Sequence, residues 1–185
     1  SVVFREAQFL ERVIRDNYSE EVDKIVVNEA FLAERLSARM QKVEVEYYSG
    51  QRNIFRHFGL SAQIDKLADR KVVMDGGAYL VIDRTEALTV IDVNTGKFVG
   101  SKNLEDTVFR TNLAAASEVA RQLRARNISG IVIVDFIDMQ TEEHRRAVVD
   151  KLRDELRKDR LKTSAVSMTG LGLVCLLYTS DAADD

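Results

Sequence analysis

In the first part of the chain, apolar side chains recur three and four positions apart with charged residues between them. This spacing predicts amphipathic helices over residues 4–18 and 29–42, and a short apolar segment followed by a helix over 54–70. Two strands are predicted between the helices. One is the short strand IVV, which follows Lys24 and ends at Asn28, and the other covers 43–48, where Val and Glu alternate as in a half-exposed strand.

The second part of the chain has longer apolar runs that are rich in β-branched residues. These runs predict a short strand over 72–74 and a hairpin of two largely buried strands over 79–83 and 87–92. A fully apolar, β-branched run over 131–134 predicts a central strand. An alternating segment over 163–168 predicts the last strand of the chain.

Two helices are predicted between the strands of this second part. Asn103 and Thr141 are N-cap candidates at their starts, and Asn127 to Gly130 can end the first helix in left-handed conformations. Helices that separate strands require crossover connections, so we expect an α/β fold with mixed sheets and crossover helices. The change from amphipathic to buried elements predicts a domain boundary near residues 70–75.

Composition narrows the class of protein. The chain has 185 residues, a charged fraction of 31% and a net charge of −3, which fits a folded globular protein and indicates that any polyanion-binding surface is local. The single cysteine excludes a disulfide framework within the chain and a metal-binding cysteine pair. Without a signal peptide or an apolar run of about 20 residues, we expect a cytoplasmic protein with no transmembrane segment.

The C-terminal residues CLLYTSDAADD differ abruptly in composition from the GLGLV segment before them. They resemble the translation of a sequencing-library transposon adapter, so we expect residues 175–185 to be a foreign tail that continues no strand. Cys175 therefore receives no functional role. The alternative is a short native tail. With a start at Ser1 rather than Met, this ending predicts a fragment of a longer protein.

Two aspartates carry the candidate chemistry. Asp92 and Asp135 each end an apolar strand, where an unpaired buried charge is costly. The loop, helix and strand between them allow the two strand ends to be neighbours, and two carboxylates at one sheet edge predict a site for a hard cation such as Mg²⁺. The alternative is that strand-end aspartates cap loops. We interpret Asp83 in that way as a turn former, and Asp138 as either a support for the metal site or a helix cap.

Polar and basic residues near these aspartates complete the candidate site. Asn94 is placed to hold a metal-bound water or to fix a carboxylate, which makes it a candidate catalytic residue. Lys97, Arg160 and Lys162 are candidate contacts for phosphate groups.

Other residues that are often functional have simpler interpretations in this chain. His57 has no carboxylate cluster near it in the sequence, so a packing or surface role is favoured over metal binding. Tyr47 and Tyr48 are interpreted as strand packing rather than a base-stacking pair. The arginines of the long helix are interpreted as a solvated face: Arg121, Arg124 and Arg126.

Three blocks resemble the catalytic domain of the RNase E/G family of bacterial endoribonucleases: TEALTVIDVNTGK, NLEDTVFRTNLAAASEVARQLRARNISGIVIVDFIDM, and the later DRLK…MTGLG. The resemblance implies that Asp92 and Asp135 bind the catalytic Mg²⁺ and that Asn94 assists them. It also implies that residues 1–70 are part of a structural RNase H-like subdomain and that 71–174 form a DNase I-like catalytic subdomain.

The resemblance further implies hydrolysis of A/U-rich single-stranded RNA during mRNA decay and the processing of precursor RNAs, including rRNA, by a homo-oligomer. The family's RNA-binding β-barrel, its 5′-end sensor and the Zn²⁺ link between protomers are expected outside this stretch. Residues 97–100, KFVG, carry fewer charges than in many relatives.

Two other functions stay open. One is a non-catalytic RNA-binding or scaffold module of the same fold. The other is a different Mg²⁺-dependent phosphotransferase, although the absence of a phosphate-binding loop of the GxxxxGK[ST] type weighs against one that uses a nucleoside triphosphate.

Overall fold

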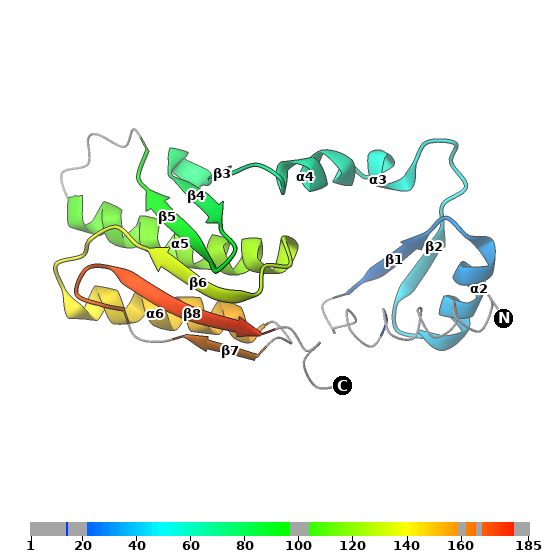
Figure 1. Ribbon diagram of the computed structural model, residues 1–185. Coiled ribbons are helices and arrows are strands. Elements are labelled where there is room, and N and C mark those ends of the chain that lie inside the picture. Colours follow the sequence, from blue (N-terminus) through cyan, green and yellow to red (C-terminus); the bar gives the residue numbers. More distant parts are fainter. Residues whose placement is uncertain (1–13, 15–21, 97–103, 159–161, 166–167, 180–185) are drawn as a thin grey trace. The chain divides into compact units, whose positions relative to one another are not determined.

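The computed structural model describes residue 14 and residues 22–96, 104–158, 162–165 and 168–179 (Figure 1). The chain divides into two compact units, Ser1–Gln63 and Ile64–Asp185. Among the described residues, no helix combines the length and the apolar character that crossing a membrane requires.

The first unit contains a two-stranded parallel sheet with a helix between its strands. Its described elements are β1 (Lys24–Val27), α2 (Ala30–Arg39), β2 (Glu44–Tyr47), α3 (Ile54–His57) and the start of α4 (Leu60–Lys66). α2 buries Ala33 and Leu36, as the amphipathic spacing predicts. The helix predicted over 4–18 lies outside the described residues, except for Ile14, which is helical.

The second unit is built on a six-stranded sheet of order β3-β4-β5-β6-β8-β7. β5 and β6 are parallel, and the other neighbours are antiparallel. A short 3₁₀ turn, Asp75–Gly77, separates β3 from β4. The strands are β3 (Lys71–Val73), β4 (Tyr79–Arg84), β5 (Leu88–Asn94), β6 (Gly130–Asp135), β7 (Lys162–Ala165) and β8 (Leu173–Thr179).

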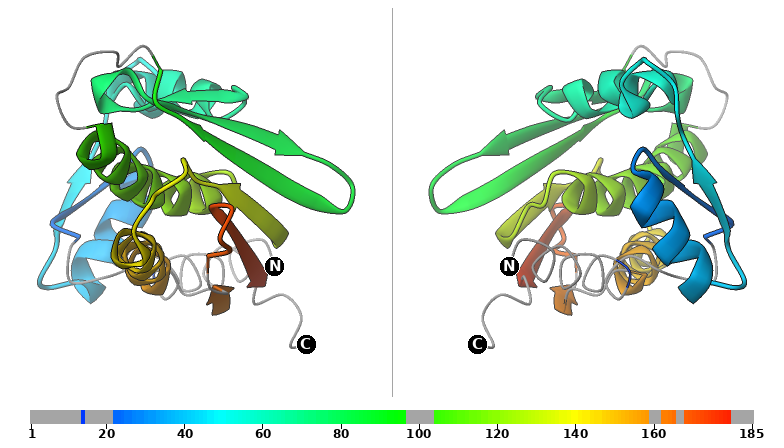
Figure 2. Two further views of the ribbon diagram at one scale, coloured as in Figure 1. Left: turned by 90° about the vertical axis from the view of Figure 1, so that its left-hand side faces the viewer. Right: turned by 90° about the vertical axis from the view of Figure 1, so that its right-hand side faces the viewer.

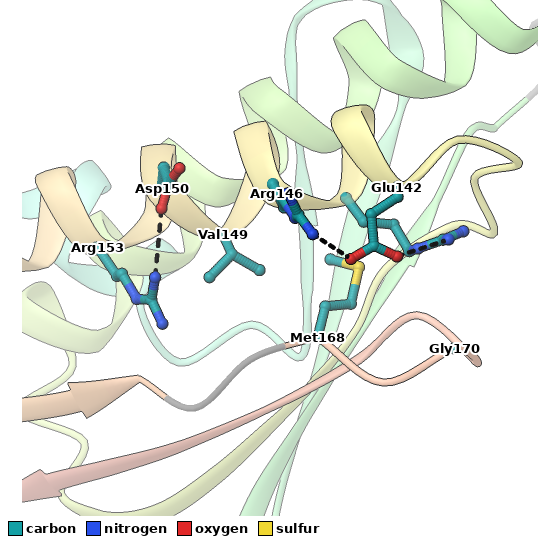
Figure 3. A pocket seen from close by; sticks show the side chains of 8 residues that line it. Glu142, Arg146, Val149, Asp150, Arg153, Met168 and Gly170 are labelled. Carbon is teal, nitrogen blue, oxygen red and sulfur yellow. Dashed lines mark hydrogen bonds and ion pairs between the residues drawn. The ribbon is translucent and has the colours of Figure 1, made fainter.

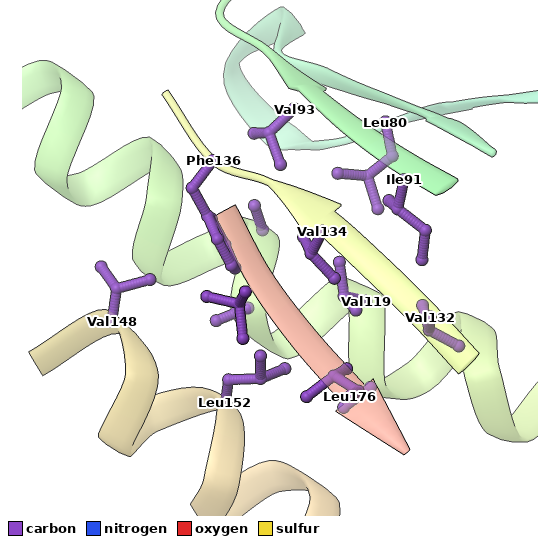
Figure 4. Close-up of a cluster of buried hydrophobic side chains, with 14 of the residues drawn as sticks. Leu80, Ile91, Val93, Val119, Val132, Val134, Phe136, Val148, Leu152 and Leu176 are labelled. Atoms are coloured by element: carbon purple, nitrogen blue, oxygen red, sulfur yellow. The ribbon is translucent and has the colours of Figure 1, made fainter. Parts of the chain in front are cut away.

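Two helices cover one face of this sheet. α5 (Leu104–Ala125) is the crossover between the parallel strands β5 and β6, and α6 (Glu142–Arg157) packs beside it (Figures 1 and 2). The side chains between helices and sheet form one hydrophobic core (Figure 4). Its fully buried members include Leu80, Ile91, Val119, Leu123, Val132, Val134, Val148, Leu152, Val174 and Leu176.

The opposite face of the sheet is open within the described part of this unit. Ile131 on β6 is 45% exposed and Val73 on β3 is 69% exposed. The prediction of a central strand over 131–134 is confirmed, because β6 lies between β5 and β8. The hairpin strands β4 and β5 are fully buried on the helix-covered face only, and their residues on the other face are half-buried or exposed. Both faces of β6 carry apolar residues, so hydrophobicity alone did not reveal that helices cover only one of them.

β8 was not predicted from the sequence. It runs from Leu173 to Thr179 and pairs antiparallel with β6, where Cys175 is the register partner of Ile133. The expectation that the final segment continues no strand is thus wrong for residues 175–179. The foreign origin of residues 175–185 stays a prediction.

The predicted helix boundaries of the second unit agree with the structure where it describes them. The Thr141 hydroxyl caps α6 by accepting a hydrogen bond from the His144 backbone N–H at 3.3 Å. After α5, Asn127 and Gly130 adopt positive φ values of 48° and 93°. The predicted N-cap of α5, Asn103, lies outside the described residues.

Candidate functional site

Asp92 and Asp135 are register partners on the parallel strands β5 and β6. Partners on neighbouring strands project from the same face of a sheet, and the strands lie about 4.8 Å apart. The expectation that the two strand ends are neighbours is confirmed. Their expected burial is not, because Asp92 is exposed and Asp135 is half-buried on the face opposite the helices.

The carboxylates of Asp92 and Asp135 lie in negatively charged surroundings. Partial burial, followed by the negative charges of Asp92 and Asp138, raises the pKa of the Asp135 carboxyl above its ordinary value. In the described part of the chain, neither Asp92 nor Asp135 is paired with a lysine, arginine or histidine. The pair is therefore a local concentration of negative charge.

Asn94 lies two residues beyond Asp92 on β5. Its side-chain amide donates a hydrogen bond of 2.8 Å to Asp92 Oδ2. Of the two roles considered for Asn94, the structure contains the contact to a carboxylate. Among the described residues, the other Asp92 oxygen accepts no hydrogen bond.

The loop that follows Asp135 is held by Asn112, which sequence reasoning missed. Asn112 is fully buried on α5, donates to the Ile137 carbonyl at 2.8 Å and accepts from the Ile137 N–H at 3.1 Å. A buried polar residue within an apolar helix face was the available signal in the sequence. Because Ile137 lies between Asp135 and Asp138, Asn112 fixes the backbone between these two carboxylates.

The far end of the same loop is fixed by Glu105 and His144. Glu105 Oε1 accepts from the Gln140 N–H at 3.2 Å and lies 3.2 Å from His144 Nδ1. The His144 ring stacks on Phe109, with the ring centroids 4.1 Å apart. These contacts join the starts of α5 and α6 around the loop, and no sequence motif indicated them.

Gly172, the last glycine of the MTGLG motif, packs directly against this loop. Its carbonyl accepts from the Phe136 N–H at 3.1 Å. A Cβ on Gly172 would lie 2.7 Å from the Phe136 carbonyl oxygen and 3.5 Å from Asp138 Oδ1. The motif therefore serves close backbone packing beside the carboxylates.

Asp138 itself is exposed at the end of this loop. Thr141 caps α6, so the helix-cap interpretation of Asp138 is wrong. Its charge contributes to the raised pKa of Asp135, which places it in the electrostatic surroundings of the pair.

Asp83 lies on the same sheet face but differs from Asp92 in having a cationic partner. Arg70 forms an ion pair with Asp83, including a hydrogen bond of 2.6 Å from Nη2 to Oδ2, and this contact lowers the pKa of the carboxyl. The turn between β4 and β5 is instead closed by Thr85, whose hydroxyl bonds with the Leu88 backbone. The interpretation of Asp83 as a turn former is wrong.

Of the three candidate phosphate contacts, the structure describes only the backbone position of Lys162. Lys97 and Arg160 lie outside the described part of the chain. Lys162 begins β7 and is paired with Thr179, whereas Leu173 at the other end of β8 is the partner of Asp135. The length of β8, roughly 20 Å at about 3.3 Å per residue, separates these positions along the strand.

Arg124 of α5 and Arg126, which follows this helix, do more than form a solvated face, so the interpretation is corrected for these two residues. Arg124 donates to the Glu155 carbonyl on α6 at 3.1 Å, and Arg126 donates to the Asp69 carbonyl at 2.8 Å. These bonds tie the end of α5 to its neighbours. Arg121 pairs with Glu118 on the same helix and is 56% exposed.

In the first unit, His57 packs against aromatic rings, as expected. Its ring centroid lies 4.7 Å from that of Tyr48 and 4.9 Å from that of Phe58. Tyr47 does not pack in the same way and is 48% exposed.

A pocket of about 470 Å³ beside α6 is rich in arginine (Figure 3). Arg145 and Arg146 pair with Glu142, and Arg153 pairs with Asp150. Because carboxylates already neutralise much of this charge, we assign the pocket no anion-binding role. It is lined by Glu142, Arg145, Arg146, Val149, Asp150, Arg153, Met168 and Gly170.

The residues present fit Mg²⁺ better than a softer metal. Among the described residues there is no group of three or more His, Cys, Asp or Glu side chains that could hold a metal ion. Asp92 and Asp135 nevertheless supply two carboxylates, and Mg²⁺ usually takes one or two from a protein while keeping several waters. Their unneutralised charge and hard oxygen donors suit this ion.

Comparisons with known proteins identify the family of the chain. The model of the Ribonuclease E/G family matches residues 1–177. Ribonuclease G of Escherichia coli strain K12 is 43% identical over 178 residues, which are 93% of this chain and 36% of that protein. Ribonuclease E of Nostoc sp. is 36% identical over 179 residues, covering 92% of this chain and 26% of that protein.

Ribonuclease E of Escherichia coli strain K12 is 32% identical over 180 residues, covering 94% of this chain and 17% of that protein. The chain thus spans between 17% and 36% of the length of these three relatives. The family match covers nearly the whole chain, and the chain belongs to the Ribonuclease E/G family.

Proposed function

We propose that this chain is the metal-binding part of an endoribonuclease that hydrolyses phosphodiester bonds of single-stranded RNA, with Mg²⁺ held by Asp92 and Asp135. The observation that carries the proposal is the direct register pairing of the two aspartates on an open sheet face, without a cationic partner among the described residues. The ribonuclease names of the relatives support RNA as the substrate.

Mg²⁺ bound at this site would polarise the phosphoryl group and lower the pKa of a coordinated water. The residues of this chain would hold the ion and orient its ligands. Asn94 fixes one oxygen of Asp92, and Asn112 fixes the backbone that follows Asp135. The exposed position of Asp92 allows an extended RNA strand to reach the carboxylates from the open face.

The same proposal includes a biological role for the full-length protein that carries this chain. We assign it to mRNA decay and to the processing of precursor RNAs, including rRNA, in the cytoplasm of the cell, as a homo-oligomer. The RNase H-like identity of residues 1–70, the DNase I-like identity of 71–174, and a Zn²⁺ link between protomers outside this stretch belong to the same proposal. They rest on the family to which the chain belongs.

The second candidate is a non-catalytic RNA-binding module. The exposure of Asp92 favours it, because an exposed carboxylate costs far less than a buried one and needs no metal to explain it. The two candidates make different predictions for variants of the carboxylate pair.

The test uses the full-length protein that carries this chain and a 5′-monophosphorylated single-stranded RNA. Cleavage is measured with and without Mg²⁺ for the wild type, Asp92→Asn and Asp135→Asn. We expect either substitution to lower kcat/KM by at least about a hundredfold, because each removes charge that holds the ion. Asp83→Asn is the matched control, since Asp83 lies on the same face but pairs with Arg70.

Cleavage by all four proteins at similar rates would overturn the metal-pair proposal. Binding of RNA without Mg²⁺-dependent cleavage in the wild type would identify the non-catalytic module. A DNA strand of the same sequence, left intact under the same conditions, would support RNA as the substrate class.

A further inference from the structure

A second pocket opens beside the carboxylate pair, on the same face of the sheet. It encloses about 690 Å³, which lies in the range of small-molecule sites. The pocket is formed between the end of β5 and the turn that precedes β4. Its lining residues are Lys71, Gly76, Gly77, Tyr79, Asn94, Thr95 and Gly96.

Tyr79 connects this pocket to the candidate metal site. It is the register partner of Asn94, so the two side chains project from the same face at neighbouring positions. Asn94 in turn donates its amide hydrogen to Asp92. A group bound on the Tyr79 ring would therefore lie beside Asn94, the residue that orients Asp92.

Lys71 supplies a positive charge in the same pocket. Its ammonium lies 3.7 Å from the centroid of the Tyr79 ring. Within the described part of the chain, Lys71 forms no ion pair with a carboxylate, in contrast to Lys24, which binds Glu44 and Glu46. Lys71 is exposed, so its ammonium is available to an anionic ligand.

Backbone rather than side chains closes one side of the pocket. A Cβ on Gly96 would lie 2.2 Å from the Gly77 carbonyl oxygen, so the two loops touch only because Gly96 has no side chain. Both glycines have positive φ values, 67° for Gly96 and 85° for Gly77. Gly77 and Gly96 therefore form a wall of the pocket that carries no side chains.

We propose that this pocket binds one nucleotide of single-stranded RNA adjacent to the scissile phosphate, with its base stacked on Tyr79 and a phosphate oxygen bound by Lys71. A nucleotide combines a π face with an anion, and the pocket combines an aromatic ring with a lysine that forms no ion pair with a carboxylate among the described residues. Stacking on an aromatic side chain accepts any base, so the pocket holds the strand without selecting a sequence. This inference rests on the proposed function, because it assigns a role to the surroundings of the same carboxylates.

Binding of a short A/U-rich single-stranded oligoribonucleotide to the full-length protein tests the inference. The measurement is made in EDTA, so that no metal-dependent cleavage occurs. We expect Tyr79→Leu to weaken binding about tenfold and Tyr79→Phe to bind within about twofold of the wild type, because the ring is the binding element. Tyr47→Leu, at an exposed tyrosine of the first unit, is the control for loss of a surface tyrosine.

Two further readouts separate binding from a structural role. Lys71→Gln should reduce the slope of log K against log salt by about 0.7, the value for one phosphate contact on a single strand. An oligonucleotide with an abasic residue next to the cleaved bond should bind the wild type more weakly, yet bind Tyr79→Leu as the intact oligonucleotide does. Such non-additivity is expected only when the ring and the base touch.

The outcomes distinguish this inference from the proposed function. If Tyr79→Leu binds as tightly as the wild type while Mg²⁺-dependent cleavage persists, the nucleotide pocket is wrong and the nuclease stands. Equal weakening of Tyr79→Leu and Tyr79→Phe would also overturn it, because the hydroxyl rather than the ring would then be responsible. If the wild type neither binds nor cleaves RNA, both proposals are wrong.

Discussion

Asp92 and Asp135 face each other as register partners on two parallel strands, with no charged side chain of opposite sign paired to either among the described residues. Two close carboxylates repel each other, and a bound divalent cation removes that repulsion. The sheet pairing that creates the repulsion also fixes the spacing of the two ligands. Metal binding at this pair should therefore be measurable as a gain in stability, independently of any reaction.

The first prediction is that Mg²⁺ stabilises the wild type against unfolding and fails to stabilise Asp92→Asn or Asp135→Asn. At about ten times the dissociation constant, the gain in the free energy of unfolding should be about 1.4 kcal/mol. Urea titrations with Mg²⁺ and with EDTA provide the measurement. Asp83→Asn should keep the full gain, and equal stabilisation of all variants would place the ion elsewhere.

The second prediction concerns Asn112 as a residue that positions the loop between Asp135 and Asp138. Asn112→Ala leaves both the N–H and the carbonyl of Ile137 without their partner, which should cost about 2–4 kcal/mol of stability. The apparent affinity for Mg²⁺ should fall about tenfold at temperatures where the variant is folded. Mg²⁺ titration of the folded protein measures this effect.

Two variants control the Asn112 experiment. Asn112→Asp keeps an acceptor for the Ile137 N–H and should retain part of the affinity for Mg²⁺. Thr111→Ala removes only a bond of 2.8 Å to the Thr107 carbonyl within α5 and should leave the affinity unchanged. A Mg²⁺ affinity of Asn112→Ala equal to that of the wild type would limit Asn112 to a role in stability.

Local sequence patterns predicted most elements of this fold, because helix periodicity and caps act over a few residues. Thr141 is the N-cap of α6, and Asn127 follows the end of α5 in a conformation with positive φ. β8 escaped prediction because residues 175–185 are interpreted from their composition as a foreign tail, although the segment LVCLLYT is largely apolar. The open sheet face escaped because the apolar run 131–134 does not reveal how many of its faces a helix covers.

For the site, the sequence supplied the residue pair but not its surroundings. Asp92 and Asp135 are recognisable in the sequence as strand-end carboxylates, and their register pairing follows from the parallel arrangement of β5 and β6. Nothing in the spacing of Asn112 indicates a contact with Ile137, which lies 25 positions along the chain. Similarly, the pairing of Asp83 with Arg70 depends on the fold. This pairing neutralises Asp83, whereas Asp92 has no such partner among the described residues.

The third prediction is that Gly172→Ala disturbs the candidate site from outside it. The new Cβ would lie 2.7 Å from the Phe136 carbonyl oxygen, and the residue has a φ of 79°, which alanine rarely adopts. We expect a loss of about 1–3 kcal/mol in stability and a lower affinity for Mg²⁺, because the backbone next to Asp135 must move. Urea unfolding and Mg²⁺ titration are the measurements.

Gly170→Ala is the matched control for this substitution. A Cβ there meets nothing within 4 Å, and its backbone conformation carries no such strain. The control should therefore differ little from the wild type in stability or Mg²⁺ affinity. Indistinguishable behaviour of the two variants would show that the loop accommodates the extra methyl group without moving.

The fourth prediction concerns the pH dependence of stability at Glu155 on α6. Hydrogen bonds from Lys151 and then Lys158 lower the pKa of the Glu155 carboxyl to about 2. A lowered pKa means that this group contributes stability above its unfolded pKa near 4.5 and loses the contribution as pH falls toward 2. Glu155→Gln should therefore cost about 0.5–1 kcal/mol at pH 7, a small value because the lysines are largely exposed.

The deficit of Glu155→Gln should shrink steadily as the pH of urea titrations is lowered from about 6 to about 3, through the range in which the unfolded carboxyl gains its proton. Glu86→Gln, at an exposed residue of the turn between β4 and β5, is the control and should show no comparable change. A deficit that stays constant across this range would mean that Glu155 stabilises α6 by packing of its side chain. In that case the charges of Lys151 and Lys158 would not contribute to stability, and Lys151→Met would not change the free energy of unfolding at low pH.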